Sequence, residues 1–206
     1  MSQIQVGILI FQDIEVLDFC GPFEVFSVTR LDEARRRETA SPFQVHLIAQ
    51  NKDSVMTTGG MQVIPNMDLG NCPKLDILVV PGGWGTRALL ENQTLLDWIK
   101  MQSEHIELLT SVCTGALLLG KAGLLENKQV TTHWRSLDWM QELFPSTIVK
   151  RDLHVVEDGN LFTSAGISAG IDMALKVVQR YYGEEVARAT AKHMEYPFPE
   201  NLHRRI

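Results

Sequence analysis

Apolar residues occur along the chain in short runs that are separated by longer segments with helical spacing. The short runs predict strands over residues 4–11, 43–50, 75–83 and 106–113. Three of them are almost continuously apolar, which is typical of strands covered on both faces in a parallel sheet. Two further segments predict hairpins, 54–66 around Gly59-Gly60 and 153–166 around Asp158-Gly159.

Helical spacing follows most of these runs. Helices are expected over residues 22–36 with Pro22 as the first helical residue, 87–104, 114–125, 136–144, and twice within 170–196 with a break at Gly183. A short strand is expected over residues 128–134. This alternation predicts an α/β fold whose open, mostly parallel sheet carries helices on both faces.

Composition narrows the class of protein. The chain has 206 residues, 45% of them hydrophobic, which suits one domain over residues 1–206 with a sizeable core. The net charge of −6 offers no broad basic surface, so we expect no nucleic-acid partner. The first apolar run is too short for a signal peptide or a membrane span. We therefore expect a cytoplasmic protein with no membrane partner.

Three scattered cysteines do not form a disulfide framework, and no CxxC, HxH or HExxH motif predicts a metal site. Cys113 differs from the other two because it ends a buried strand directly before a helix. A strand-to-helix turn of this kind is the geometry of a nucleophile elbow, and Gly115 supplies the small residue that the elbow needs two places on. The helix N-terminus is expected to lower the thiol pKa. The alternative is a buried packing cysteine.

A second group with acid/base chemistry follows the first strand, at the same expected edge of the sheet. Asp18 lies among apolar neighbours, where desolvation raises the pKa of a carboxyl group and fits it for proton transfer. Its alternative role is to cap the helix expected from Pro22. Glu24 is expected on the outer face of that helix.

Glycine-rich turns are expected to complete the site. Gly82 and Gly83 follow the third strand, and their N–H groups are a candidate second half of an oxyanion hole. The segment 164–172 contains Ile167 and forms another strand-to-helix wall. Phe19, Trp84 and Ile167 predict an apolar lining.

One histidine is expected near the site. His133 lies twenty residues after Cys113, and a structural histidine beside Trp134 is the alternative. His193 and Glu195 have the spacing of the remaining members of a Cys-His-acid triad. However, they belong to a continuous helical pattern, so we do not assign them to the site.

The residues taken together resemble the ThiJ/PfpI superfamily, which has the flavodoxin-like, class I glutamine amidotransferase-like fold. The matching stretches are LDFCGPFEVF (17–26), LVVPGGWG (78–85), SVCTGALLLGKAGLLENKQVTTHW (111–134) and GNLFTSAGISAGIDMAL (159–175). The chain is most similar to the isocyanide hydratase group and to the ligand domains of AraC-type regulators. The few residues after the expected helix at 170–182 are too short for the DNA-binding region of such regulators.

The resemblance implies a lyase that adds water to an isocyanide without a cofactor and gives an N-substituted formamide. It implies that Cys113 attacks the isocyanide carbon, that Asp18 transfers protons, and that Thr114 assists. It also implies a small-molecule substrate, a backbone wall beginning at Ile167, and a homodimer. Two alternatives remain open: a small-molecule or redox sensor without turnover, and another superfamily activity such as a glyoxalase-like, amidase or peptidase reaction.

Overall fold

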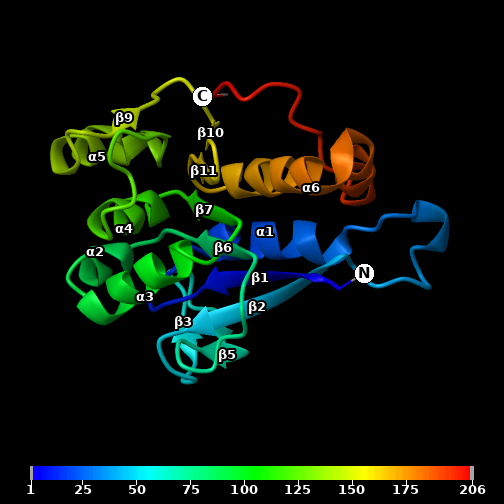
Figure 1. Cartoon of the computed structure of the whole chain (residues 1–206), viewed down its shortest axis with the longest axis horizontal. Helices are drawn as coiled ribbons and strands as arrows, with labels where there is room; N and C mark the ends of the chain where they lie inside the picture. Colours follow the sequence, from blue (N-terminus) through cyan, green and yellow to red (C-terminus); the bar gives the residue numbers. More distant parts are fainter. Residues whose placement is uncertain (1, 205–206) are drawn as a thin grey trace.

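The computed structural model describes residues 2–204 and contains one central seven-stranded sheet (Figure 1). The strand order is β10-β11-β7-β6-β1-β2-β5, and every neighbouring pair is parallel except β10 with β11. These strands span β1 Ile4–Leu9, β2 Phe43–Ala49, β5 Met67–Asp68, β6 Ile77–Val80, β7 Leu108–Val112, β10 Val155–Asp158 and β11 Leu161–Ser164. The open, mostly parallel sheet expected from the sequence is confirmed.

Helices cover both faces of the sheet. They are α1 Val16–Val28, α2 Thr86–Leu89, α3 Gln93–Ser103, α4 Gly115–Lys121, α5 Leu137–Leu143 and α6 Ala169–His193. The chain moves from β1 to β2 in one direction across the sheet and from β6 to β7 in the other. Because parallel crossovers are right-handed, α1 and α3 lie on opposite faces. Helix α6 packs against α1, and α4 packs against α2 and α3.

The core is centred on the two middle strands. Every residue of β6 and β7 is buried, as are Leu117, Leu118 and Leu119 of α4. Burying one such aliphatic side chain contributes about 1.5–3 kcal/mol relative to leaving it exposed. The site-bearing ends of β6 and β7 are therefore held by fully buried strands.

Small paired segments lie outside the main sheet. The hairpin expected over 54–66 consists of β3 Val55–Met56 and β4 Gln62–Val63. The strand expected over 128–134 is limited to β8 Gln129–Val130, which pairs with β9 Ile148–Val149. No helix within residues 2–204 is long and apolar enough to cross a membrane.

The boundaries of several helices differ from the sequence prediction. Helix α1 begins at Val16 and contains Pro22, because Phe19 and Phe26 bury one side of it in the core and outweigh the proline's missing N–H. It ends at Val28, and only the 3₁₀ turn Glu33–Arg35 follows. The single helix expected over 87–104 is two, because the Asn92 side chain accepts a hydrogen bond from Leu95 N and starts α3 afresh.

The last helical segment is interrupted where the sequence predicts it. Gly183 has φ of 86° and ψ of 166° inside α6, a conformation that is essentially restricted to glycine. His193 ends this helix on an exposed turn, and Glu195 is exposed beyond it. Neither residue lines the pocket that contains Cys113.

Candidate active site

Cys113 lies at the carboxyl end of β7, in the turn that leads into α4. Its φ of 56° is in the left-handed region, which is unusual for a residue with a side chain. The backbone is held there from both sides: Cys113 N donates to Ser164 O (3.2 Å) and Ala165 O (3.1 Å), and Thr132 Oγ1 donates to Cys113 O (2.7 Å). The structure thus has the strained elbow that was expected at this residue.

Gly115 permits the elbow because α4 starts almost in contact with the end of β6. A Cβ atom at this position would lie 1.9 Å from the carbonyl oxygen of Val80 and 2.7 Å from that of Pro81. Only a residue without a side chain fits there. The packing of α4 on β6 and the placement of the cysteine therefore depend on the same glycine.

Asp18 lies beside the cysteine and is fully buried. It occupies the first turn of α1, so it is not the cap of a helix that begins at Pro22, and residue Glu15 holds the N-cap position. Gly82 N donates to Asp18 Oδ2 at 3.0 Å, whereas Oδ1 makes no hydrogen bond of standard geometry within residues 2–204. The remaining polar neighbour of the carboxyl group is the Cys113 thiol.

Burial dominates the electrostatics of this pair. Desolvation raises the pKa of Asp18 to about 8, and the hydrogen bond from Gly82 only partly opposes it. The direction agrees with the expectation from its apolar neighbours. For Cys113 the expectation was wrong: burial and the neighbouring Asp18 carboxylate raise the thiol pKa, and the backbone of Thr114 opposes them only in part. Burial therefore favours the protonated form of both groups.

The glycine loop, which contains Gly82 and Gly83, has hydrogen-bond partners that the sequence did not predict. The N–H of Gly82 donates to Asp18, and the N–H of Gly83 donates to Thr114 Oγ1 at 3.0 Å. Both donors of the expected oxyanion hole are thus engaged by side chains. Thr114 Oγ1 also interacts with Gly83 O (3.3 Å) and Thr86 Oγ1 (3.1 Å), so its hydroxyl ties the glycine loop to the elbow.

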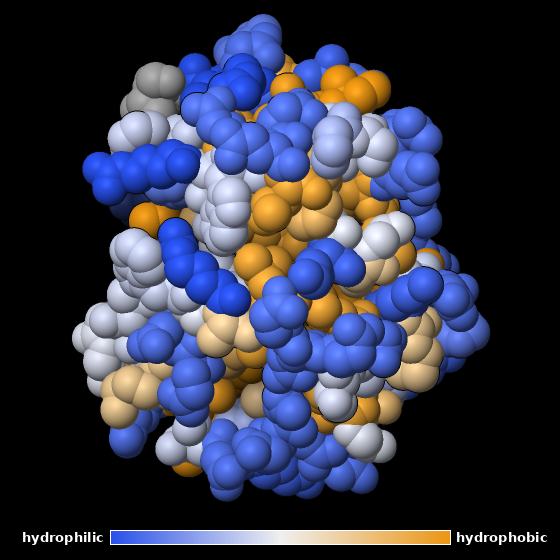
Figure 2. All heavy atoms as spheres, turned by 90° about the vertical axis from the view of Figure 1, so that its left-hand side faces the viewer, coloured by the Kyte–Doolittle hydropathy of each residue, from blue (hydrophilic) through white to orange (hydrophobic). Residues whose placement is uncertain are grey.

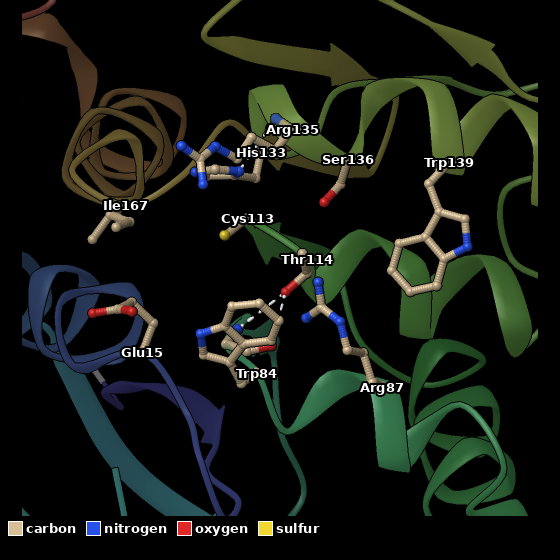
Figure 3. Close-up of a pocket in the computed structure, with 11 residues that line it drawn as sticks. Glu15, Trp84, Arg87, Cys113, Thr114, His133, Arg135, Ser136, Trp139 and Ile167 are labelled. Atoms are coloured by element: carbon tan, nitrogen blue, oxygen red, sulfur yellow. Dashed lines mark hydrogen bonds between the residues drawn. The ribbon is translucent and has the colours of Figure 1, made fainter. Parts of the chain in front are cut away.

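A cavity of about 290 Å³ opens above the cysteine at the carboxyl ends of the strands (Figure 3). Its lining comes from five segments of the chain: Glu15, Gly83, Trp84, Arg87, Cys113, Thr114, His133, Arg135, Ser136, Trp139 and Ile167. On the face that lies to the left in Figure 1, apolar residues form an exposed band between hydrophilic ones (Figure 2). The cavity is a candidate small-molecule site at the place where open α/β sheets bind ligands.

His133 is one wall of this cavity. Its Nδ1 accepts a hydrogen bond from Arg135 N at 3.3 Å, so the remaining proton of the neutral ring is on Nε2. Burial, Arg135 and Arg204 all lower its pKa. The ring also packs near Trp134, with centroids 5.8 Å apart, so both alternatives considered for this histidine have a structural basis.

The segment that contains Ile167 is held in place by hydrogen bonds on both sides of it. The next turn carries Asp172, whose Oδ1 accepts from the Tyr196 hydroxyl at 2.9 Å and whose Oδ2 lies 3.2 Å from His154 Nε2. His154 O in turn accepts from Ala165 N at 2.8 Å. The loop that passes beside the sulfur is therefore tied to the sheet at both of its ends.

These features match a known family. The sequence profile of the DJ-1/PfpI family matches residues 4–180. The chain belongs to the DJ-1/PfpI family. The resemblance to the ThiJ/PfpI superfamily and its flavodoxin-like fold is thus confirmed.

Individual DJ-1/PfpI relatives differ in what they do. The chain is 38% identical to an isonitrile hydratase of Pseudomonas putida over 94% of its own length and 78% of that protein. It is 27% identical to the transcriptional regulator GbdR of Pseudomonas aeruginosa, of which it spans 50%. A ThiJ/PfpI protein of Pseudomonas syringae has the same fold, with a TM-score of 0.84 and 29% identity over 98% of this chain and 78% of that one.

Several residues of the pocket lining were not expected from the sequence of this DJ-1/PfpI chain. Among them are Arg87, Arg135, Ser136 and Trp139, which no local motif marks. These residues lie at or near the starts of α2 and α5, and only the fold brings these two helix starts close to Cys113. In contrast, Phe19 was expected in the lining but is only 2% exposed, because it belongs to the hydrophobic core.

Proposed function

We propose that this protein is a cofactor-independent hydratase that converts an isocyanide, R–N≡C, into the formamide R–NH–CHO. The observation that carries the proposal is the isolated pair of Cys113, in a strained elbow, and Asp18, buried beside it with a raised pKa. A weak nucleophile activated by an adjacent base is the arrangement that covalent catalysis requires. The similarity to an isonitrile hydratase supports the choice of substrate.

The first half of the proposed reaction forms a covalent adduct. The ionised form of Asp18 takes the proton of the Cys113 thiol as the sulfur attacks the terminal carbon of the isocyanide. The same proton then passes from Asp18 to that carbon, and the product is the thioimidate R–N=CH–S–Cys113. One C–S and one C–H bond form, and no electron acceptor is needed.

The second half releases the product. Asp18 removes a proton from a water molecule that adds to the thioimidate carbon, and it delivers that proton to the nitrogen. The resulting carbinol expels the sulfur while Asp18 passes the carbinol O–H proton to the sulfur, so the C–S bond breaks and a C=O bond forms. The Cys113 thiol is restored, Asp18 returns to its ionised form, and the sum of the steps is the addition of one water molecule. Thr114 positions the glycine loop in this proposal.

A homodimer is part of the same proposal. Exposed apolar residues lie on α1 and the neighbouring β3–β4 hairpin, including Leu17, Met56 and Met61. The hairpin is joined to this region by the bridge between Ile14 and Thr57. Light scattering on the purified protein tests the dimer, and a Met61→Asp variant should shift it toward the monomer.

Formation of a formamide from an aryl isocyanide, followed by its ultraviolet absorbance, tests the activity. We expect turnover by the wild type and its loss in Cys113→Ala and Asp18→Asn, with Cys20→Ala as the matched cysteine control. Absence of turnover in wild-type protein, with rapid oxidation of Cys113 by peroxide, would support a thiol sensor instead.

A further inference from the structure

Two arginines line the pocket without an acidic partner. No ion pair or side-chain hydrogen bond within residues 2–204 involves the guanidinium group of Arg87 or Arg135. Asp138, the nearest acid along the chain from Arg135, pairs with Arg151 at 2.7 Å. Two unpaired cations in one cavity are notable in a chain whose net charge is −6.

Arg87 is held in a fixed orientation by aromatic rings. Its guanidinium carbon lies 4.1 Å from the centroid of the Trp84 indole and 5.5 Å from that of Trp139. Figure 3 shows the group between the two rings, on the same side of the cavity as Ser136. Stacking occupies the faces of a guanidinium and leaves its N–H edges to bind a carboxylate in two parallel hydrogen bonds.

Cationic side chains outnumber acidic ones in the lining, where Arg87 and Arg135 occur with a single carboxylate. Glu15 is the acidic residue of the lining, and it lies across the cavity from Arg87 and Trp139 (Figure 3). The Trp84 indole supplies a flat apolar surface beside Arg87, and Ile167 supplies a further apolar contact on the other side of the sulfur (Figure 3).

We propose that the substrate of this pocket carries an anionic group on a flat apolar body, and that Arg87 with Arg135 binds that anion. This inference rests on the proposed hydratase function, which gives the reacting isocyanide group. It adds the chemical class of the R group: an aryl or similarly flat group with a carboxylate at its far end. Arg87 supplies the bidentate contact, and Arg135 supplies a second positive charge.

The test compares two probes that differ only in charge, 4-isocyanobenzoate and its methyl ester. We expect kcat/KM of the wild type to favour the carboxylate by about 10- to 100-fold, the range for one charged hydrogen-bonded contact. Arg87→Met keeps the apolar stem and should abolish this preference through KM, with the ester little affected. Arg87→Lys should restore it only in part, because an ammonium group cannot form the bidentate contact.

The matched control is Arg37→Met, which removes the same charge from an exposed position outside the pocket. It should retain the full preference. Equal turnover of both probes by the wild type, or an equal loss for both in Arg87→Met, overturns the inference while the hydratase function stands.

Calorimetric titration with 4-formamidobenzoate and its methyl ester separates the inference from the reaction. Binding of the acid that exceeds binding of the ester and is lost in Arg87→Met supports an anion site even if no isocyanide is turned over. In that result the proposed function fails and the inference does not. Equal binding of acid and ester overturns the inference by itself.

Discussion

Replacement of Asp18 by asparagine is expected to stabilise the protein while it abolishes turnover. Asp18 is fully buried, and its pKa is raised from 3.8 to about 8. The native state therefore keeps this proton over a range of pH in which the unfolded chain has already lost it. Rising pH between these two values favours the unfolded chain, by about 1.4 kcal/mol for each pH unit.

The size of the effect follows from the two pKa values. At pH 7 the unfolded chain has an advantage of about 4 kcal/mol from this one group, and the advantage grows by about 3 kcal/mol between pH 5 and pH 7. Asparagine has the shape of the protonated acid and can accept the hydrogen bond from Gly82, but it does not titrate. The variant should therefore be more stable by up to these amounts.

Urea denaturation of wild type and Asp18→Asn at pH 5 and pH 7 measures the prediction. The quantity compared is the change with pH of the stability difference between the two proteins, in which the other titrating groups cancel. Glu24→Gln is the control, because Glu24 is an exposed carboxylate on the same helix. A stability difference that stays constant from pH 5 to pH 7 would refute the argument that desolvation raises the pKa of Asp18.

Three further substitutions test the geometry of the site and the fold. Gly115→Ala places a Cβ atom 1.9 Å from Val80 O and should cost about 3 kcal/mol in urea denaturation, with turnover lost; unchanged stability would contradict the close approach of α4 to β6. Gly183→Ala imposes a φ of 86° on a residue with a side chain but meets no atom within 4 Å, so it should cost about 2 kcal/mol from backbone strain alone and leave kcat unchanged. Thr114→Val leaves the Gly83 N–H without its partner and should lower stability by about 1–3 kcal/mol together with kcat, and Thr114→Ser should restore both.

The buried parallel strands, the elbow and the placement of Asp18 at the same edge of the sheet follow from local patterns in the sequence. Continuous apolar runs predict buried parallel strands, and adjacent carboxyl ends of such strands meet at one edge. The start of α1 could not be predicted in the same way. Pro22 is a local signal for a first helical residue, whereas the observed start at Val16 depends on the burial of Phe19 and Phe26 in the assembled core.

The remaining differences also have tertiary causes. The N–H groups of Gly82 and Gly83 lie where the sequence places them, but their partners come from α1 and the elbow. The expectation of a lowered thiol pKa considered only the helix that follows Cys113. It omitted burial and the charge of Asp18, which lie outside the local sequence and act in the opposite direction.

The occupied glycine N–H groups bear on the choice among the chemistries of this family. Acyl transfer develops negative charge on an oxygen, and its catalysts keep two free donors aimed at that oxygen. An isocyanide instead accepts the sulfur and a proton at one carbon, so its first step needs an acid beside the nucleophile and no oxyanion hole. Asp18 beside Cys113 supplies the first requirement, while Gly82 and Gly83 have no donor left for the second.

A thiol sensor, in turn, depends on an accessible thiolate of low pKa, but Cys113 is 6% exposed and its pKa is raised. The environment of the cysteine therefore favours the proposed hydratase over acyl transfer and over a thiol sensor.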